Sequence, residues 1–331
     1  MADKKRLRML VKLCCIFLIG GLLLAACSDQ KSNSDTIGSK DETTDAEHAV
    51  RIGYQKNCPL LILKSLGTLE KRLKKMGYSV EWKEFQAGPP LVEALNAGSI
   101  DFGRTGNTPP IFSQAAGAPF VYVAAGNSKL EGSGILVPKD SPIKSLEDLK
   151  GKKIGFANGS SSHYLVVKAL KQASLSYSDI TPAFLQPGDA RVAFEQGNID
   201  AWAVWDPFVA ATEINSDARL LVNGEGITTD RDFFLAHEQF AKHHKPVLEA
   251  IIEEVDNSSD WANSNHDALV KLLAPALKLD EKSVAQAIDR RVYGVEKINE
   301  EIIGEQQQIA DLFATLKIIP KKIDVHEAMP K

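Results

Sequence analysis

The chain has 331 residues, which is long enough for two α/β lobes with a core each. Apolar residues make up 44% and charged residues 25%, as in ordinary soluble globular proteins. The net charge is −4, and five basic residues against one acidic residue in positions 1–26 leave −8 for the remainder. An acidic body argues against a nucleic-acid partner. The sequence holds no metal-ligand cluster and no phosphate-binding P-loop, so we expect no metal and no cofactor.

The first 26 residues have the pattern of a secretory signal peptide. A basic start precedes an apolar run at 13–26 that is too short to span a bilayer comfortably. The run ends in Leu-Ala-Ala-Cys at 24–27, which resembles the lipobox of bacterial lipoproteins. This resemblance implies cleavage before Cys27 and a palmitate-bearing diacylglycerol on its sulfur. The alternative is an ordinary signal peptide with an incidental cysteine. Residues 27–48 are rich in Ser, Asp, Lys and Thr and predict a flexible tether.

The four cysteines do not predict a disulfide. Cys14 and Cys15 lie in the signal peptide, and Cys27 is the predicted lipidation site. Cys58 alone is left, so we expect no intramolecular disulfide in the mature protein.

The folded part begins near residue 49 with alternating strands and helices. Short strand patterns lie at 50–54, 80–85 and 100–102, and helical spacing of apolar residues lies at 60–76 and 91–96. Each of these helical patterns is followed by a glycine, Gly77 or Gly98, which is typical of a helix end. This alternation predicts a parallel α/β sheet.

The order of these signals then repeats. Residues 154–156 parallel residues 52–54, and residues 193–200 parallel residues 94–101. The glycine of the strand and the glycine of the helix end are 45 residues apart in the first copy and 42 in the second. Such a repeat favours two lobes of similar architecture. The segment from about 237 to 320 shows mainly helical spacing, and we expect it to pack on the first lobe.

These segments together resemble the type II periplasmic binding proteins, and more narrowly the aliphatic sulfonate-binding proteins, relatives of the taurine- and nitrate-binding ones. The resemblance runs from about 51 to 322 and is carried by residues 51–56, 93–101, 105–112, 159–163, 196–202, 205–207 and 306–313.

The resemblance implies two Rossmann-like lobes with a ligand cleft between them. Lobe one would comprise 49–135 and 236–331, and lobe two 136–235. The implied protein is a monomeric, extracytoplasmic, lipid-anchored binding protein that serves the permease and ATPase of an ABC importer. Its implied ligand is a small anion, an alkanesulfonate, taken up for sulfur metabolism.

One candidate anion site lies at 159–163, where Gly159, Ser160, Ser161 and Ser162 follow a strand and open a helix. A helix N-terminus presents unpaired N–H groups and partial positive charge, glycine permits close approach, and serine hydroxyls add donors. The alternative is that one serine is merely the N-cap. His163 is interpreted either as a cationic donor or as a neutral residue of the first helical turn.

The opposite wall of the cleft is predicted from lobe one. Thr105, Gly106 and Asn107 follow the third strand and could meet the same anion, and Gln55 ends the first strand as a neutral donor. Trp205 ends a strand in lobe two, where it would form an apolar wall for an alkyl tail. Phe234 would close the cavity where the chain returns between the lobes.

Two alternatives to an alkanesulfonate importer stay open from the sequence. The ligand could be taurine, nitrate or a thiamine-precursor pyrimidine. Alternatively Cys58, at the entrance of the first helix, could be a nucleophile, since some desulfinases of this fold use a cysteine near this point. The lipobox and the tether favour a capture role over catalysis.

Overall fold

The computed structural model describes residues 48–56 and 58–329, and all structural statements concern these residues. The predicted signal peptide, Cys27 and the tether up to residue 47 lie outside them. Within the described part of the chain, no helix is long and apolar enough to cross a membrane.

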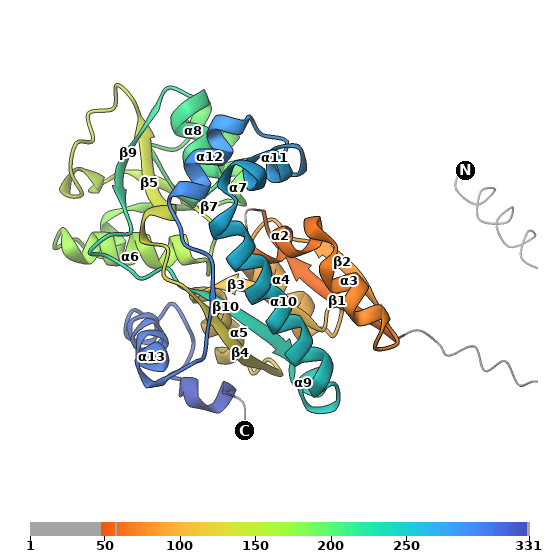
Figure 1. Cartoon of the computed structure of the whole chain (residues 1–331). Helices are drawn as coiled ribbons and strands as arrows, with labels where there is room; N and C mark the ends of the chain where they lie inside the picture. Colours follow the sequence, from red (N-terminus) through yellow and green to blue (C-terminus); the bar gives the residue numbers. More distant parts are fainter. Residues whose placement is uncertain (1–47, 57, 330–331) are drawn as a thin grey trace, which may run out of the picture. The chain divides into compact units, whose positions relative to one another are not determined.

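The first sheet has six strands in the order β11-β4-β10-β3-β1-β2 (Figure 1). β1 runs parallel to β2 and β3, whereas β10 is antiparallel to both β3 and β4. Their bounds are β1 (His48–Tyr54), β2 (Tyr78–Glu84), β3 (Phe102–Gly106), β4 (Phe120–Gly126), β10 (Asp232–His237) and β11 (Val295–Glu296).

The helices between these strands differ from the sequence prediction at one point. The single helix expected at 60–76 is two helices, α2 (Pro59–Leu66) and α3 (Thr68–Lys74). Gly67 separates them with a left-handed backbone, φ 64°, which glycine adopts without the steric cost that other residues incur. α4 (Gly88–Asn96) and α5 (Thr108–Ala115) follow and both begin with prolines in the first turn.

The second sheet has five strands in the order β7-β6-β8-β5-β9. β6 is parallel to β7 and β8, and β5 is antiparallel to β8 and β9. The strands are β5 (Ser133–Pro138), β6 (Lys153–Phe156), β7 (Thr181–Phe184), β8 (Ala201–Trp205) and β9 (Ala218–Asn223), with helices α6 (Ser161–Gln172), α7 (Pro187–Glu195) and α8 (Phe208–Asn215). The predicted fold class, two α/β lobes, is confirmed.

The chain crosses between the two sheets in two segments, 127–132 and 224–231. β5 belongs to the second sheet and begins at Ser133, and β10 belongs to the first sheet and begins at Asp232. The chain therefore enters the second sheet at Ser133 and returns to the first sheet at Asp232. Both crossing segments lie beside the site described below.

The C-terminal segment is helical, as predicted, and consists of α9 (Glu238–His243), α10 (Lys245–Ser264), α11 (His266–Leu277), α12 (Glu281–Asp289) and α13 (Glu300–Thr315). α10 and α11 contribute to the apolar core of lobe one. The segment also reaches lobe two, because Phe313 of α13 packs with Tyr164 of α6. A second contact joins α8 to α12: the Asn215 side chain of α8 donates to Asp280, the N-cap residue of α12, with N and O 2.8 Å apart.

Candidate functional site

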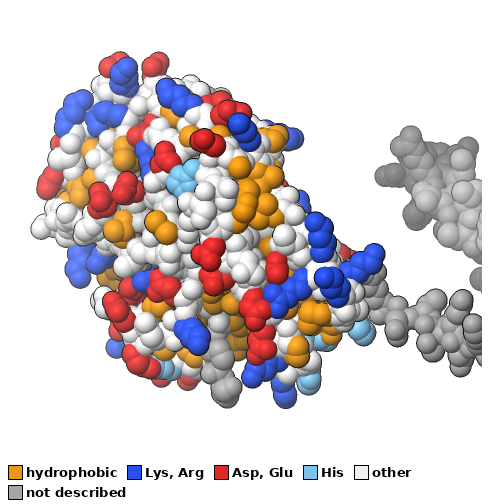
Figure 2. All heavy atoms as spheres, viewed as in Figure 1, with side chains coloured by type: hydrophobic (Ala, Val, Ile, Leu, Met, Phe, Trp, Pro, Cys, Tyr) orange, Lys and Arg blue, Asp and Glu red, His pale blue; other side chains and the backbone are white. Residues whose placement is uncertain are grey.

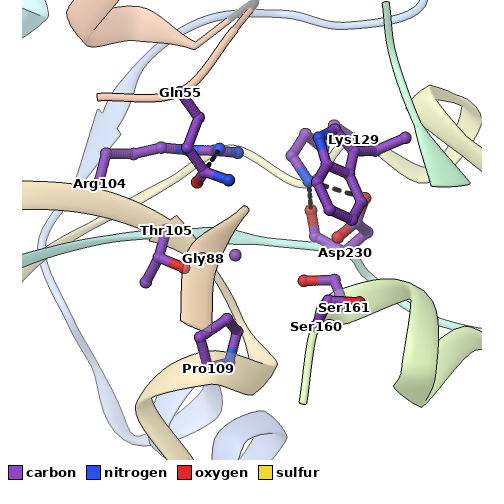
Figure 3. Close-up of a pocket in the computed structure, with 11 residues that line it drawn as sticks. Gln55, Gly88, Arg104, Thr105, Pro109, Lys129, Ser160, Ser161 and Asp230 are labelled. Carbon is purple, nitrogen blue, oxygen red and sulfur yellow. Dashed lines mark hydrogen bonds and ion pairs between the residues drawn. The ribbon is translucent and has the colours of Figure 1, made fainter. Parts of the chain in front are cut away.

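A cavity lies between the two sheets, where strands end and helices begin (Figure 3). Lobe one, the two crossing segments and lobe two all contribute to its wall. Its lining residues are Gln55, Gly88, Arg104, Thr105, Gly106, Pro109, Lys129, Ser160, Ser161, Trp205 and Asp230.

Three helices start at this cavity. Gly88 is the first residue of α4, Pro109 lies in the first turn of α5, and Ser161 is the first residue of α6. The first N–H groups of a helix have no partner within it, and they carry partial positive charge. The first turns of α4 and α5 each contain two prolines, which have no N–H, so α6 presents the fullest set of free donors. All three helix ends contribute partial positive charge, which favours a negatively charged ligand.

The two lobes touch across the cavity. A β-carbon on Gly106, at the end of β3, would lie 2.1 Å from the side-chain oxygen of Ser161 on α6. Any larger residue at position 106 would therefore force the Ser161 hydroxyl to rotate away from its place in the cavity wall. The structure therefore brings Gly106 and Ser161, both predicted from the sequence, together from opposite lobes.

The glycine and the three predicted serines have different surroundings. Ser160 is the N-cap of α6: its hydroxyl donates to the Ala157 carbonyl at 2.7 Å and accepts from the His163 N–H at 3.4 Å. Ser161 lines the cavity. Ser162 is fully buried with no hydrogen-bond partner for its hydroxyl, and neither it nor Gly159 is among the lining residues.

His163 lies behind the cavity wall among aromatic rings. Its Nδ1 accepts from the Gly159 N–H at 3.2 Å, and its ring centroid is 4.9 Å from Phe156 and 5.3 Å from Phe313. Burial lowers the pKa of His163 to about 4, so the imidazole is neutral at pH 7. Of the two interpretations of His163, the geometry supports the neutral residue of the first helical turn.

The lobe-one residues also divide into cavity wall and support. Thr105 is buried and lines the cavity, and its hydroxyl has no hydrogen-bond partner. Gln55 lines it too, and in either orientation its amide lies between Arg104 and the start of α4. Asn107 is the N-cap residue of α5 and is not a lining residue; its carbonyl accepts from Gln306 at 2.8 Å.

Of the two aromatic residues predicted to line the cavity, Trp205 lines it and Phe234 does not. Trp205 is half-buried at the end of β8 and lines the cavity, while Trp202 is buried in the core of lobe two. Phe234 is fully buried in the core of lobe one, stacked on Phe102, and is not a lining residue. Cys58 is buried at the N-cap position of α2, as predicted, and does not line the cavity.

A buried cluster of five charged side chains adjoins the cavity: Arg104, Lys129, Asp230, Asp232 and Arg291. Lys129 Nζ lies 2.7 Å from Asp230 Oδ2 and 3.3 Å from Asp232 Oδ1. Arg104 pairs with Asp232 Oδ1, and Arg291 Nη2 lies 2.9 Å from Asp232 Oδ2. Among these five side chains, cations outnumber carboxylates by one. Buried Asp206, whose pKa burial raises to about 7, lies within electrostatic reach of Arg291 and is only partly ionised at pH 7.

The surplus charge depends on the proton of Lys129. Burial lowers the pKa of Lys129 to about 8, and the neighbouring Arg104 and Arg291 act in the same direction, against the attraction of Asp230. Lys129 is therefore mostly charged at pH 7, but it loses its proton at a lower pH than an exposed lysine does. Together with the three helix ends, the ion cluster gives the cavity wall a positive character.

Arg104, Lys129 and Asp230 were not identified from the sequence. Arg104 directly precedes the predicted Thr105, and an arginine inside the strand pattern of residues 102–106 was the available signal. Lys129 and Asp230 lie in the crossing segments, where no periodicity indicates burial. Their pairing joins residues about a hundred positions apart, which a single sequence does not reveal.

Comparisons with known proteins agree with this architecture. Residues 73–268 match the family described as NMT1/THI5 like. An aliphatic sulfonates-binding protein of Escherichia coli (strain K12) is 41% identical over 84% of this chain and 88% of that protein. Its counterpart by name in Bacillus subtilis (strain 168) is 35% identical over 93% of this chain and 91% of that protein.

Among solved structures, the alkanesulfonate-binding protein SsuA from Xanthomonas axonopodis pv. citri, bound to MOPS, is similar with a TM-score of 0.83 and 38% identity. The similarity covers 86% of this chain and 99% of that one. These relatives are binding proteins and not enzymes, which excludes the desulfinase alternative for Cys58. The chain belongs to the NMT1/THI5-like family and, within it, to the aliphatic sulfonate-binding proteins of ABC-type transporters.

Proposed function

We propose that this protein captures alkanesulfonates outside the cytoplasm and delivers them to the permease and ATPase of an ABC importer, as a source of sulfur. The observation that carries this proposal is the surplus positive charge of the ion cluster beside a cavity ringed by three helix N-termini. A sulfonate is a monovalent anion with three acceptor oxygens and no proton at neutral pH, so it matches both features.

The cavity wall offers specific partners to such a ligand. The Thr105 hydroxyl and Arg104 Nε are buried donors without partners, and a bound oxyanion would satisfy both. Ser161 and the first N–H groups of α6 would contact the anion from lobe two. Trp205 would then cover the alkyl tail. Gly159, Ser162, His163, Asn107 and Phe234 would support the wall from behind.

The alternatives to an alkanesulfonate fit the cavity less well. Nitrate has no tail and would leave the Trp205 wall without a contact. A neutral pyrimidine would leave the surplus positive charge of the ion cluster unpaired, which is costly in a buried site. The named ligand of the Xanthomonas relative, MOPS, is itself a sulfonate on a propyl chain, which supports the sulfonate class.

The membrane anchor is proposed from the sequence. Cys27 would carry the lipid after signal cleavage, and residues 28–47 would link it to the first strand, which begins at His48. The protein would then act at the extracytoplasmic face of the cell membrane, close to its permease.

Ser161→Ala is expected to weaken the binding of ethanesulfonate by about tenfold or more. A hydrogen bond to a charged group contributes about 1.5–3 kcal/mol, and about 1.4 kcal/mol corresponds to tenfold in affinity. Isothermal titration measures the change. Ser162→Ala is the matched control, because its hydroxyl is buried on the same helical turn and does not line the cavity. Equal losses in both variants, or no loss in Ser161→Ala, would contradict the placement of the anion.

Affinity for ethanesulfonate is expected to fall as the pH rises from 7 to 9.5. Deprotonation of Lys129, with its pKa of about 8, removes the surplus positive charge. Burial raises the pKa of Asp206 to about 7, so this carboxyl gains its negative charge as the pH rises and should add to the fall, whereas His163 is already neutral. Lys129→Arg keeps its charge throughout and should show a flatter profile. A wild-type profile that is flat to pH 9.5 would show that Lys129 does not act on the anion.

Cys27→Ser is expected to abolish lipid attachment. In cells supplied with labelled palmitate, the wild-type protein should carry label and the Cys27→Ser protein should not. The variant should be released or left unprocessed. Label on Cys27→Ser as strong as on the wild type would disprove the proposed anchor.

A further inference from the structure

The two carboxylate oxygens of Asp230 have different surroundings. Oδ2 accepts from the Ser133 hydroxyl and lies 2.7 Å from Lys129 Nζ. Oδ1 is buried and has no hydrogen-bond partner among residues 48–56 and 58–329. Asp230 is 1% exposed and lines the cavity. A buried carboxylate oxygen is costly unless it accepts a hydrogen bond, so Oδ1 is available to a donor from outside the protein.

The backbone holds Asp230 in a fixed position. Its φ is 41°, in the left-handed region that few residues other than glycine adopt, although aspartate tolerates it. Its N–H donates to the Thr228 hydroxyl at 3.1 Å, and its carbonyl accepts from Lys129 Nζ at 2.8 Å. Backbone conformations of this kind persist where surrounding contacts enforce them, often at ligand sites.

The charge of Asp230 restricts which donor can approach. Burial opposes ionisation, but the attraction of Lys129 and the hydrogen bonds from Lys129 and Ser133 lower the pKa of Asp230. The ionised carboxylate can only accept hydrogen bonds. Lys129 Nζ already lies on the other oxygen, so an ammonium at Oδ1 would meet a like charge nearby. A neutral donor, such as a hydroxyl, avoids this repulsion.

The cavity wall therefore contains both hydrogen-bond donors and a hydrogen-bond acceptor that a ligand could satisfy. Arg104 Nε and the Thr105 hydroxyl are donors without partners, whereas Asp230 Oδ1 is an acceptor without one. An unsubstituted alkanesulfonate would satisfy the donors and leave Oδ1 unpaired. We propose that Asp230 is a specificity-determining residue that accepts a hydrogen bond from a hydroxyl of the ligand, so that the preferred substrates are hydroxyalkanesulfonates. This inference rests on the proposed sulfonate-binding function.

Three ligands of equal length test the inference: ethanesulfonate, 2-hydroxyethanesulfonate and 2-aminoethanesulfonate, each titrated calorimetrically into the wild-type protein at pH 7. The hydroxy compound should bind about tenfold or more tightly than ethanesulfonate, since a hydrogen bond to a charged acceptor is gained. It should also bind more tightly than the amino compound. Equal affinities for the first two ligands would overturn the inference, because Oδ1 would then be satisfied by water.

A pair of variants separates the role of Asp230 from the charge of the ion cluster. Asp230→Asn and Asp232→Asn each remove one negative charge, but Asp232 does not line the cavity. Asparagine also tolerates the left-handed backbone at position 230. The ratio of the affinities for 2-hydroxyethanesulfonate and ethanesulfonate should fall severalfold in Asp230→Asn, because hydrogen bonds to ionised acceptors are about twice as strong as neutral ones. The ratio should persist in Asp232→Asn.

Two further outcomes would count against the inference. An unchanged ratio in Asp230→Asn, or an equal fall in both variants, would assign the hydroxyl preference to another group or to the charge of the ion cluster. Ethanesulfonate binding without a hydroxyl preference would overturn the inference and leave the proposed function intact. If no sulfonate binds the wild type, the proposed function fails together with the inference.

Discussion

The structure depends on the buried ion cluster of Arg104, Lys129, Asp230, Asp232 and Arg291. Arg104 comes from β3, Lys129 and Asp230 from the two segments that cross between the lobes, Asp232 from the start of β10 and Arg291 from the segment after α12. Buried charges are costly unless they are paired, and removal of one partner strands the others. The cluster therefore holds both crossing segments and the C-terminal segment at one point, which fixes where the lobes meet.

The same cluster determines the character of the cavity. Two carboxylates position three cations, and the unbalanced charge lies beside the N-termini of α4, α5 and α6. The start of α6 supplies N–H donors, the starts of α4 and α5 supply mainly partial positive charge, and the ion cluster supplies the net charge. A cavity built from helix ends alone would bind anions through local dipoles, with little preference for their total charge. The surplus of one charge adds a preference for a monovalent ligand. Elsewhere the surface mixes acidic and basic side chains, as Figure 2 shows for one face.

Most of the fold follows from local sequence signals. The two α/β lobes could be predicted from the strand patterns and from Gly98 and Gly197, which follow helices. One wall of the cavity could be predicted from the glycine and serines at the start of α6. Trp205 could be predicted as a wall residue because it ends its strand, and it does line the cavity. The limits are also physical. Ser160, Ser161 and Ser162 could not all face one anion, because successive residues of a helix turn by about 100°. The break at Gly67 was missed because apolar spacing continues across it. The ion cluster was missed because its members come together only when the lobes are assembled.

The central claim is that the cavity carries one surplus positive charge. Methanesulfonate and sulfate test it most directly, because they have similar tetrahedral shapes but carry one and two negative charges. The measurement is calorimetric titration of each anion into the wild-type protein at pH 7, with neutral dimethyl sulfone as the reference. Methanesulfonate is expected to bind, and sulfate to bind far more weakly because its second charge would be buried without a partner. Sulfate affinity equal to or above that of methanesulfonate would show that the cavity holds no such limit on charge.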